Sequence, residues 1–453
     1  MEKTWQSQSV KVTVLLNHLT KRRKTMSKRD YSKQMQKRQS IKESTLVVGV
    51  DIGRKFNAVG FMNKEGKVLG KHPKVYNSRA GFDYFVNAVE EVKAKHGLTD
   101  VLIGLEPTGH YWRNLAYFAK SRGYAVWFIR TTALKHQREL DESSSAKNDL
   151  RDAITLANIT REGKYIDTVI EDGIYRQLRT LCKVRERIKR YNVGSKNTLA
   201  AALDDYFPEL RKIFWSTNSR GLWAILEMCP FPDDLLKVKV SKIKRIIAKS
   251  SRRGKTAYDK AIDLHKAAKE SIGLKNIGNS DRYRIKIGLQ EVKRTEGMLK
   301  EIEKEMKVLL KQIPYAQYIL SIYGMGPLST AMFLGELGNP ANFQNARQII
   351  KYAGYDPQEK DSGQMVGRKR ISKKGRWLLR KTLFFMGMRV VVKKGYFKDY
   401  YLRKLETKNR FGQLLKKKEG ICAVIIKLIK VIFALMRDRR MFDDKSGVLS
   451  LAA

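Results

Sequence analysis

The pattern of apolar and polar positions becomes regular at residue 46 and predicts both strands and helices as far as residue 165. Short β-branched or alternating runs predict strands at 46–51, 55–62, 66–69, near Val75, at 101–106 and at 125–129. Apolar residues at helical spacing predict helices at 79–96, 111–122 and 149–161. A hairpin followed by strand–helix alternation favours a mixed sheet flanked by helices.

Beyond residue 172 the pattern changes to two long charged helices. Their apolar residues step by threes and fours, from Leu178 to Leu203 in the first helix and from Ile285 to Ile313 in the second. We expect these helices to pair as an antiparallel coiled coil. Residues 204–280 between them are basic and contain three prolines, which predicts a smaller helical insertion. Pro314 ends the second long helix.

The part from 315 to 440 is expected to be mostly helical and contains a glycine motif. Gly324 and Gly326 lie two residues apart, immediately before an apolar helix. This spacing places backbone N–H groups at a helix N-terminus, where they can hold a phosphate group. The motif therefore predicts a helix-hairpin-helix-like element that binds nucleic acid without reading its bases.

These patterns define an α/β plus α protein with five segments. They are a basic disordered arm at 1–44, a sheet domain at 45–165 with the element order of ribonuclease H, coiled-coil helices at 172–314, a C-terminal domain at 315–440 and a tail at 441–453. A true start at Met26 would explain the biased composition of the arm equally well.

Composition then limits what the protein binds. The 453 residues include 92 Lys or Arg and 45 Asp or Glu, which leaves a net charge of +47. Counterion release from a polyanion offsets the self-repulsion of such a chain, which favours DNA or RNA over an anionic membrane surface. Three distant cysteines cannot build a disulfide framework or a zinc knuckle, and no apolar run reaches the roughly 18 residues of a membrane span.

Positive charge is densest between Gln364 and Glu419, where there are 19 Lys or Arg and 3 acids. Basic and aromatic residues at this density are typical of a nucleic-acid face, although a solvated helix surface around an aromatic core is the alternative. We expect the charges to bind nucleic acid and the aromatic side chains to form core. The aromatic residues are Trp377, Phe384, Phe385, Tyr396, Phe397, Tyr400 and Tyr401. The expected nucleic-acid contacts are Arg368, Lys369, Arg370, Lys373, Lys374 and Arg376.

Four acidic residues stand out against this basic background. Asp51 and Glu106 end two predicted strands, and Asp149 and Asp152 lie three apart on one face of a predicted helix. Singly, each is explained as a strand terminus, a helix cap or a first-turn charge. Together they would repel one another unless divalent cations lay between them. Two Mg²⁺ ions held by carboxylates can stabilise both oxygens of a phosphodiester exchange.

Two sets of motifs resemble one known family. The runs Val48–Gly53, Gly104–Gly109 and Lys147–Ala153 closely resemble motifs of the DEDD transposases of bacterial and archaeal insertion sequences. The family's second domain is similar to Gly324–Pro327, Ala353–Gly354, Ser362–Gly363 and Arg370–Gly375. The resemblance covers about 46–440, and the long basic arm and the large insertion at 204–280 depart from it.

This resemblance implies a RuvC-like, ribonuclease H-like domain and a catalytic serine. Asp51, Glu106, Asp149 and Asp152 would bind Mg²⁺, with Mn²⁺ as a substitute, and Ser362 would be the nucleophile. The partners implied are double-stranded DNA, a guide RNA encoded by the element, and further copies of the chain in a dimer or tetramer. In such oligomers the serine of one subunit joins the carboxylates of another. The expected location is the prokaryotic cytoplasm, at the nucleoid.

Two other classes of protein remain open at this point. A RuvC-like nuclease that uses water as the nucleophile would need the four acids but not Ser362, and it would leave the C-terminal half unexplained. A non-catalytic nucleic-acid-binding protein derived from a transposase would be favoured by loss of an acid. All four acids are present.

Overall fold

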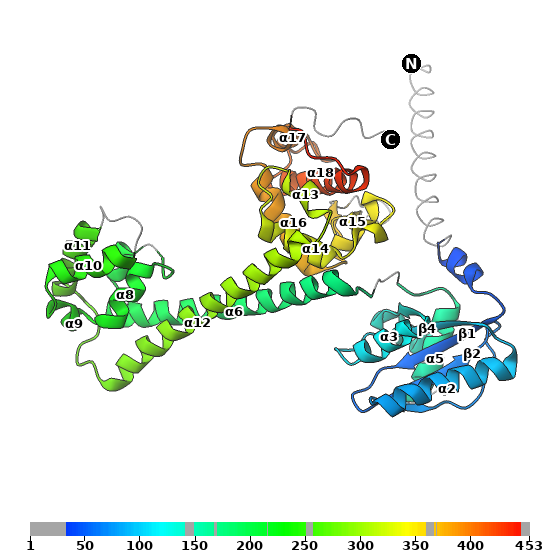
Figure 1. Cartoon of the computed structure of the whole chain (residues 1–453). Coiled ribbons are helices and arrows are strands. Elements are labelled where there is room, and N and C mark those ends of the chain that lie inside the picture. Colours follow the sequence, from blue (N-terminus) through cyan, green and yellow to red (C-terminus); the bar gives the residue numbers. More distant parts are fainter. Residues whose placement is uncertain are drawn as a thin grey trace, which may run out of the picture. The chain divides into compact units, whose positions relative to one another are not determined.

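A computed structural model describes residues 33–140, 149–166, 170–214, 216–250, 257–358, 367 and 369–444. The chain forms two compact units, Met1–Ile170 and Glu171–Ala453 (Figure 1). The first contains a sheet, and the second is almost entirely helical where it is described.

The first unit is built on a mixed five-stranded sheet in the order β3-β2-β1-β4-β5. Its strands are β1 (Thr45–Asp51), β2 (Phe56–Met62), β3 (Lys74–Tyr76), β4 (Asp100–Leu105) and β5 (Ala125–Phe128). Strand β2 is antiparallel to β1 and β3, whereas β4 and β5 continue the sheet in parallel with β1. The predicted mixed sheet is confirmed and is compatible with a ribonuclease H-like fold. The expected strand at 66–69 is reduced to one bridge, between Met62 and Val68.

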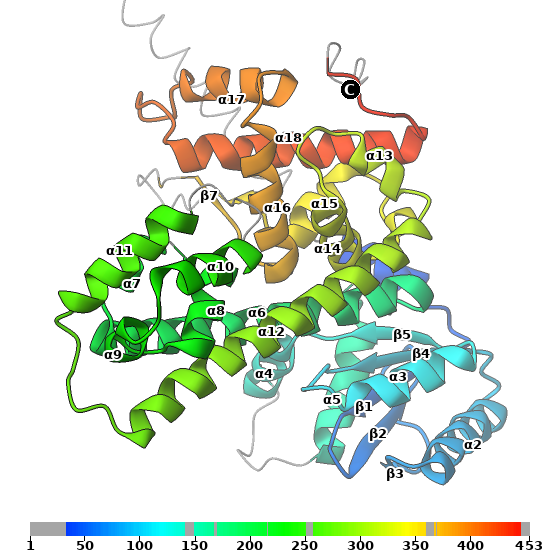
Figure 2. The ribbon, with the colours of Figure 1, turned by 60° about the vertical axis from the view of Figure 1, so that its left-hand side comes forward.

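Helices cover both faces of this sheet (Figures 1 and 2). One face packs against α2 (Arg79–His96) and α3 (Trp112–Ser121), and the other against α5 (Asp149–Arg161). The side chains of β1 alternate accordingly, with Val48 and Val50 in the core below α2 and α3. A helix that the sequence did not predict, α4 (Thr131–Leu140), packs beside α5.

A row of three glycines determines how closely α5 approaches the sheet. Gly60, Gly49 and Gly104 are register partners on β2, β1 and β4. A β-carbon at Gly49 would lie 1.9 Å from the carbonyl oxygen of Ala153, and one at Gly104 would lie 1.7 Å from the Thr160 hydroxyl oxygen. Since neither distance is tolerable, only glycine allows the α5 backbone to rest on the strands.

Residues 33–40 are helical, which corrects the expected disorder of this part of the basic arm. The Gln34 side-chain amide donates to the Glu162 carbonyl at 3.2 Å, and the Lys37 ammonium donates to the Tyr165 carbonyl at 2.9 Å. Ile41 is 3% exposed. These contacts attach the segment to the chain that follows α5. The rest of the predicted arm, 1–32, lies outside the described residues.

In the second unit, two long helices pair along their lengths. They are α6 (Gly173–Tyr206) and α12 (Asn279–Lys311). Residue numbers of the contacts rise along α6 as they fall along α12. Arg185 donates to Glu303 at 2.6 Å, and the Asn192 amide donates to the Thr295 hydroxyl at 2.9 Å. The pair is therefore antiparallel. Its buried centre is polar, in contrast to the continuous apolar seam that a coiled-coil pattern predicts.

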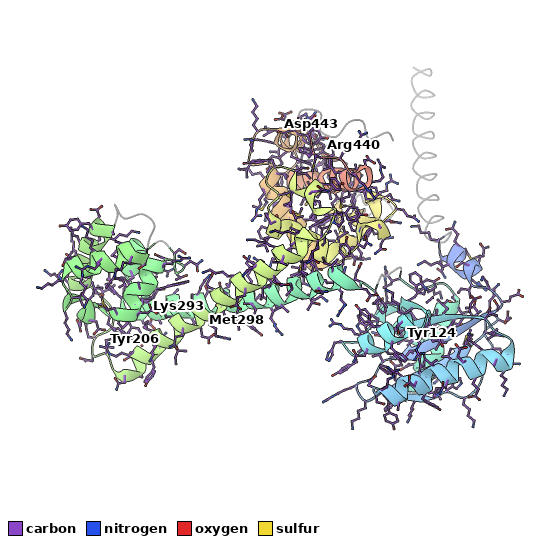
Figure 3. All side chains as sticks on the ribbon, in the orientation of Figure 1. Tyr124, Tyr206, Lys293, Met298, Arg440 and Asp443 are labelled. Carbon is purple, nitrogen blue, oxygen red and sulfur yellow. The ribbon has the colours of Figure 1, made fainter. Side chains whose placement is uncertain are left out.

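Each end of this helix pair belongs to a different apolar core. One core joins the end of α6 and the start of α12 to α7 (Leu210–Ile213), α8 (Arg220–Met228), α9 (Pro232–Leu236), α10 (Val240–Ser250) and α11 (Ala257–Lys269). Figure 3 marks Tyr206 in this core and Met298 on α12 outside it. Also marked is Lys293, which pairs with Glu227 of α8.

The other core is formed by the C-terminal helices. They are α13 (Ala316–Leu320), α14 (Pro327–Leu337), α15 (Ala346–Ala353), α16 (Trp377–Val390), α17 (Tyr396–Leu405) and α18 (Lys417–Asp438). A two-stranded ribbon of β6 (Pro357–Gln358) and β7 (Arg370–Ile371) lies between α15 and α16 in the sequence. Within the described ranges, no helix has the length and apolar character needed to cross a membrane.

Candidate active site and nucleic-acid interface

Asp51 and Glu106 lie at neighbouring strand ends on the same face of the sheet. Strands β1 and β4 are parallel, and Val50 is paired with Leu105, so Asp51 is the last residue of β1 and Glu106 directly follows β4. Gly49 faces α5, and because side chains alternate along a strand, Asp51 two residues later faces α5 as well. The same reasoning applies to Gly104 and Glu106. Adjacent strands are about 4.8 Å apart, which makes these carboxylates neighbours.

The second acidic pair comes from the first turn of α5. Ala153 lies over Gly49 of β1, and Arg161 at the other end of α5 donates to the Lys64 carbonyl, just beyond the end of β2 that pairs with the start of β1. The start of α5 therefore points toward the end of β1 that carries Asp51. Asp152 is 4% exposed, whereas Asp149 is exposed. The glycine row therefore brings the helical acids to the same edge of the sheet as Asp51 and Glu106.

The electrostatics of Asp51 show that the four acids converge. Its pKa is raised from 3.8 to about 6. Burial of the carboxyl group is the largest cause, followed by the negative charges of Asp152, Asp149 and Glu106, in that order. The positive charge of Arg138 acts in the opposite direction. Each of the other three acids is thus close enough to oppose the ionisation of Asp51.

Arg138 of α4 is the cation in contact with this acidic group. Its Nε donates to Asp152 Oδ1 at 2.6 Å, and its Nη2 lies 2.5 Å from Asp152 Oδ2. The second contact is an ion pair only, since its geometry is not that of a hydrogen bond. Sequence reasoning did not find Arg138, since nothing in its spacing separates it from the other 91 basic residues of the chain.

As a donor set, these residues suit a hard divalent cation. Carboxylate oxygens are the ligands that Mg²⁺ prefers, and four carboxylates gather here beside the cation of Arg138. In the described part of the chain, no three His, Cys, Asp or Glu side chains are already arranged around a single ion position. The acids gather at one edge, but one of them is turned toward Arg138. The residues are therefore suitable ligands for a metal ion, but they are not yet arranged in a coordination geometry.

The predicted nucleophile, Ser362, lies outside the described residues, as does Arg368. The structure does describe the residues that bracket them. Gln358 of β6 is paired with Arg370 of β7, and the Ser372 hydroxyl donates to the Asp356 carboxylate.

The predicted basic interface is divided between exposed and internal cations. Lys369, Arg370, Lys373 and Lys374 are exposed. In contrast, Arg376 donates to Glu336 at 2.9 Å, and Glu336 is 2% exposed. Arg376 therefore compensates a buried acid inside the domain, and its contact with nucleic acid stays a prediction.

The glycine motif forms a tight turn before α14. Gly324 has a φ of 83°, in the left-handed region that favours glycine. The N–H of Gly326 donates to the Ser329 hydroxyl at 3.2 Å, so this N–H is already used within the helix start. A phosphate held here would have to use other backbone N–H groups or displace Ser329.

Two of the aromatic residues expected in the core lie at the surface instead. Trp377 is 54% exposed and Phe385 is 47% exposed, both on α16. The Lys381 ammonium lies 6.0 Å from the centre of the Trp377 ring. The remaining aromatic residues of this region pack against the C-terminal core. Helical spacing puts an aromatic residue on a face of its helix but does not say whether another element covers that face.

Comparisons with known proteins match both halves of the chain. Residues 48–208 match a family model of DEDD type described as a transposase, and residues 316–402 match one described as the IS116/IS110/IS902 transposase family. Together with the acid-bearing sheet, these matches define a DNA transposase or recombinase. The chain belongs to the IS110 family of DEDD transposases.

Individual relatives agree with this assignment. The chain is 22% identical to a 44.8 kDa protein of insertion element IS116 from Streptomyces clavuligerus, over 91% of this chain and 100% of the relative. It is 23% identical to the IS117 mini-circle protein of Streptomyces coelicolor, over 72% and 80% of the two chains. A pilin gene-inverting protein of Moraxella bovis is 28% identical over 29% of this chain and 39% of its own length.

Proposed function

We propose that this transposase cuts and rejoins DNA strands through a covalent link to Ser362, with divalent metal ions held by Asp51, Glu106, Asp149 and Asp152. The observation that carries the proposal is the convergence of the four acids on one edge of the sheet. Burial, followed by the charges of the other three acids, raises the pKa of Asp51. Acids placed so close together favour a site that gains from binding a cation.

The proposed reaction is a phosphodiester exchange. The Ser362 oxygen gives up its proton and bonds to phosphorus, while the bond from phosphorus to one sugar oxygen breaks and that oxygen takes up a proton. The phosphoserine link keeps the energy of the broken bond, so attack by a new sugar hydroxyl rejoins the strands and releases the serine. A bound Mg²⁺ or Mn²⁺ would lower the pKa of the attacking hydroxyl and neutralise charge on the phosphate.

The partners follow from charge and from the family resemblance. Duplex DNA would contact the exposed cations Lys369, Arg370, Lys373 and Lys374, with Arg368, Arg376 and the Gly324–Gly326 turn as further contacts. An element-encoded guide RNA would select the DNA sites. A dimer or tetramer would join Ser362 of one subunit to the acids of another, in the prokaryotic cytoplasm at the nucleoid.

The test is denaturing electrophoresis of the protein with labelled donor DNA, co-purified RNA and Mg²⁺. The wild-type protein should give a DNA adduct that survives denaturation and disappears on protease treatment. Ser362→Ala should give neither adduct nor cleavage. Ser372→Ala is a matched control in the same region and should keep the adduct. Free cleaved ends from Ser362→Ala at the wild-type rate would instead identify a nuclease that uses water.

A further inference from the structure

We propose that Arg138 is the resting counter-ion of the acidic site, and that a divalent cation must displace its guanidinium from Asp152 in order to bind. The inference rests on the proposed function in one respect, namely that the four acids hold the metal ion. It adds a residue that competes with the ion for the most deeply buried of those acids.

The geometry makes the guanidinium a substitute for a metal ion. Both oxygens of Asp152 lie within 2.6 Å of Arg138 nitrogens, so the whole carboxylate edge is occupied. Arg138 therefore does electrostatically, with one charge, what a divalent ion would do with two.

Burial of the two partners is unequal, and this allows exchange. The Asp152 side chain is 5% exposed, whereas that of Arg138 is 43% exposed. Removing the cation without replacement would leave a buried carboxylate uncompensated, which is costly. The guanidinium itself can turn into water at little cost, because almost half of its side chain is already solvated. Exchange is thus favourable only when another cation takes its place.

The packing of α4 explains why the guanidinium can move without its helix. Leu134, one turn before Arg138 on the same helix face, is 2% exposed and packs in a cluster with Leu156 and Ile159 of α5. This apolar contact holds α4 against α5 independently of the ion pair. The long, unbranched arginine side chain then needs only a rotamer change to release Asp152.

The experiment is calorimetric titration of the metal-free, full-length protein with Mn²⁺. Arg138→Gln should bind Mn²⁺ about tenfold more tightly than the wild type, because the competing cation is gone. Its thermal midpoint without metal should fall, and saturating Mn²⁺ should restore it to the wild-type value. Lys135→Gln is the matched control. Lys135 is on the same helix, pairs with Glu139 at 3.8 Å and is 76% exposed, so its removal should change Mn²⁺ affinity by less than about twofold.

A conservative variant keeps the test decisive if Arg138→Gln does not fold without metal. Arg138→Lys retains the charge and loses the two-point contact, and should bind Mn²⁺ with an affinity above that of the wild type. Unchanged or weaker binding in the Arg138 variants would overturn the inference, because the guanidinium would then orient Asp152 and not compete for it. If Asp51→Asn binds Mn²⁺ with the same affinity as the wild type, the metal site of the proposed function would instead be overturned.

Discussion

The two units of the protein treat buried acids in opposite ways. Three acids are buried among the described residues of the helical unit, and each has a cation of its own. Glu171 lies 3.9 Å from Arg179, Glu186 pairs with Lys381, and Glu336 pairs with Arg376. In the sheet unit, Asp51, Glu106, Asp149 and Asp152 converge. Of these four acids, only Asp152 forms an ion pair with a cation among the described residues. Pairing each buried acid with a cation allows the acid to be packed inside a domain. An excess of acids leaves unfavourable repulsion between carboxylates, which a bound cation can reduce. The difference separates structural from functional carboxylates without reference to sequence motifs.

The largest expected effect concerns the cations that the helical unit leaves exposed. Replacing Lys369, Arg370, Lys373 and Lys374 together with Ala should lower affinity for duplex DNA by up to about a thousandfold at 0.1 M salt, and the slope of log affinity against log salt by up to about 3.6. Fluorescence anisotropy over a salt series would measure both. Sequence preference should change little, since phosphate contacts position the DNA without reading it.

A charge-matched control separates this surface from the overall net charge. Lys300, Lys304, Lys307 and Lys311 are four exposed residues of α12, and replacing them removes the same charge. If both quadruple variants lose the same affinity, the loop containing Lys373 and Lys374 is not a particular interface.

A second, smaller effect is expected on stability when a buried acid of the helical unit loses its paired cation. Arg376→Ala leaves Glu336 buried without its cation and should lower the free energy of unfolding by about 3 kcal/mol, measured by urea titration. Lys374→Ala, two residues earlier and exposed, should change it by less than about 0.5 kcal/mol. A similar small value for Arg376→Ala would mean that Glu336 is protonated or solvated in the folded protein.

The smallest expected effect is a gain in stability, in contrast to the loss expected for Arg376→Ala, and it concerns Asp51 in the acidic site. The folded protein holds Asp51 at a pKa of about 6, above the ordinary 3.8, so ionisation of Asp51 opposes folding. The penalty is absent below about pH 4, grows as the pH rises to 6, and is complete above it. Without metal, Asp51→Asn should therefore stabilise the protein by about 1 kcal/mol at pH 7.5, a value reduced for the partial exposure of the side chain.

Thermal unfolding of both proteins from pH 4 to pH 8, in chelator, would check this prediction. The two curves should meet near pH 4 and separate above it. Saturating Mg²⁺ should reverse their order, because Asn is a poorer ligand. A wild type that is the more stable protein in chelator at pH 7.5 would contradict the view that burial and the neighbouring acids oppose the ionisation of Asp51.

The sequence was informative where chemistry and secondary structure coincide. Asp51 and Glu106 follow β-branched runs, and Asp149 and Asp152 share a helix face, so their convergence could be expected from a parallel sheet with a covering helix. The partner of Asp152 could not be predicted, because α4 lacks a clear apolar repeat and its cation resembles many others. The order of residues 33–40 was also missed, since it depends on tertiary contacts to Glu162 and Tyr165.

The glycine row has a consequence for how the site tolerates change. Where side chains separate a helix from a sheet, any substitution in that layer alters the spacing and moves whatever the helix carries. Here main-chain atoms of α5 meet main-chain atoms of the strands at Gly49 and Gly60, so their spacing does not depend on side-chain volume. The apolar layers around this contact can therefore drift during evolution while the distance between the strand acids and the helical acids stays fixed.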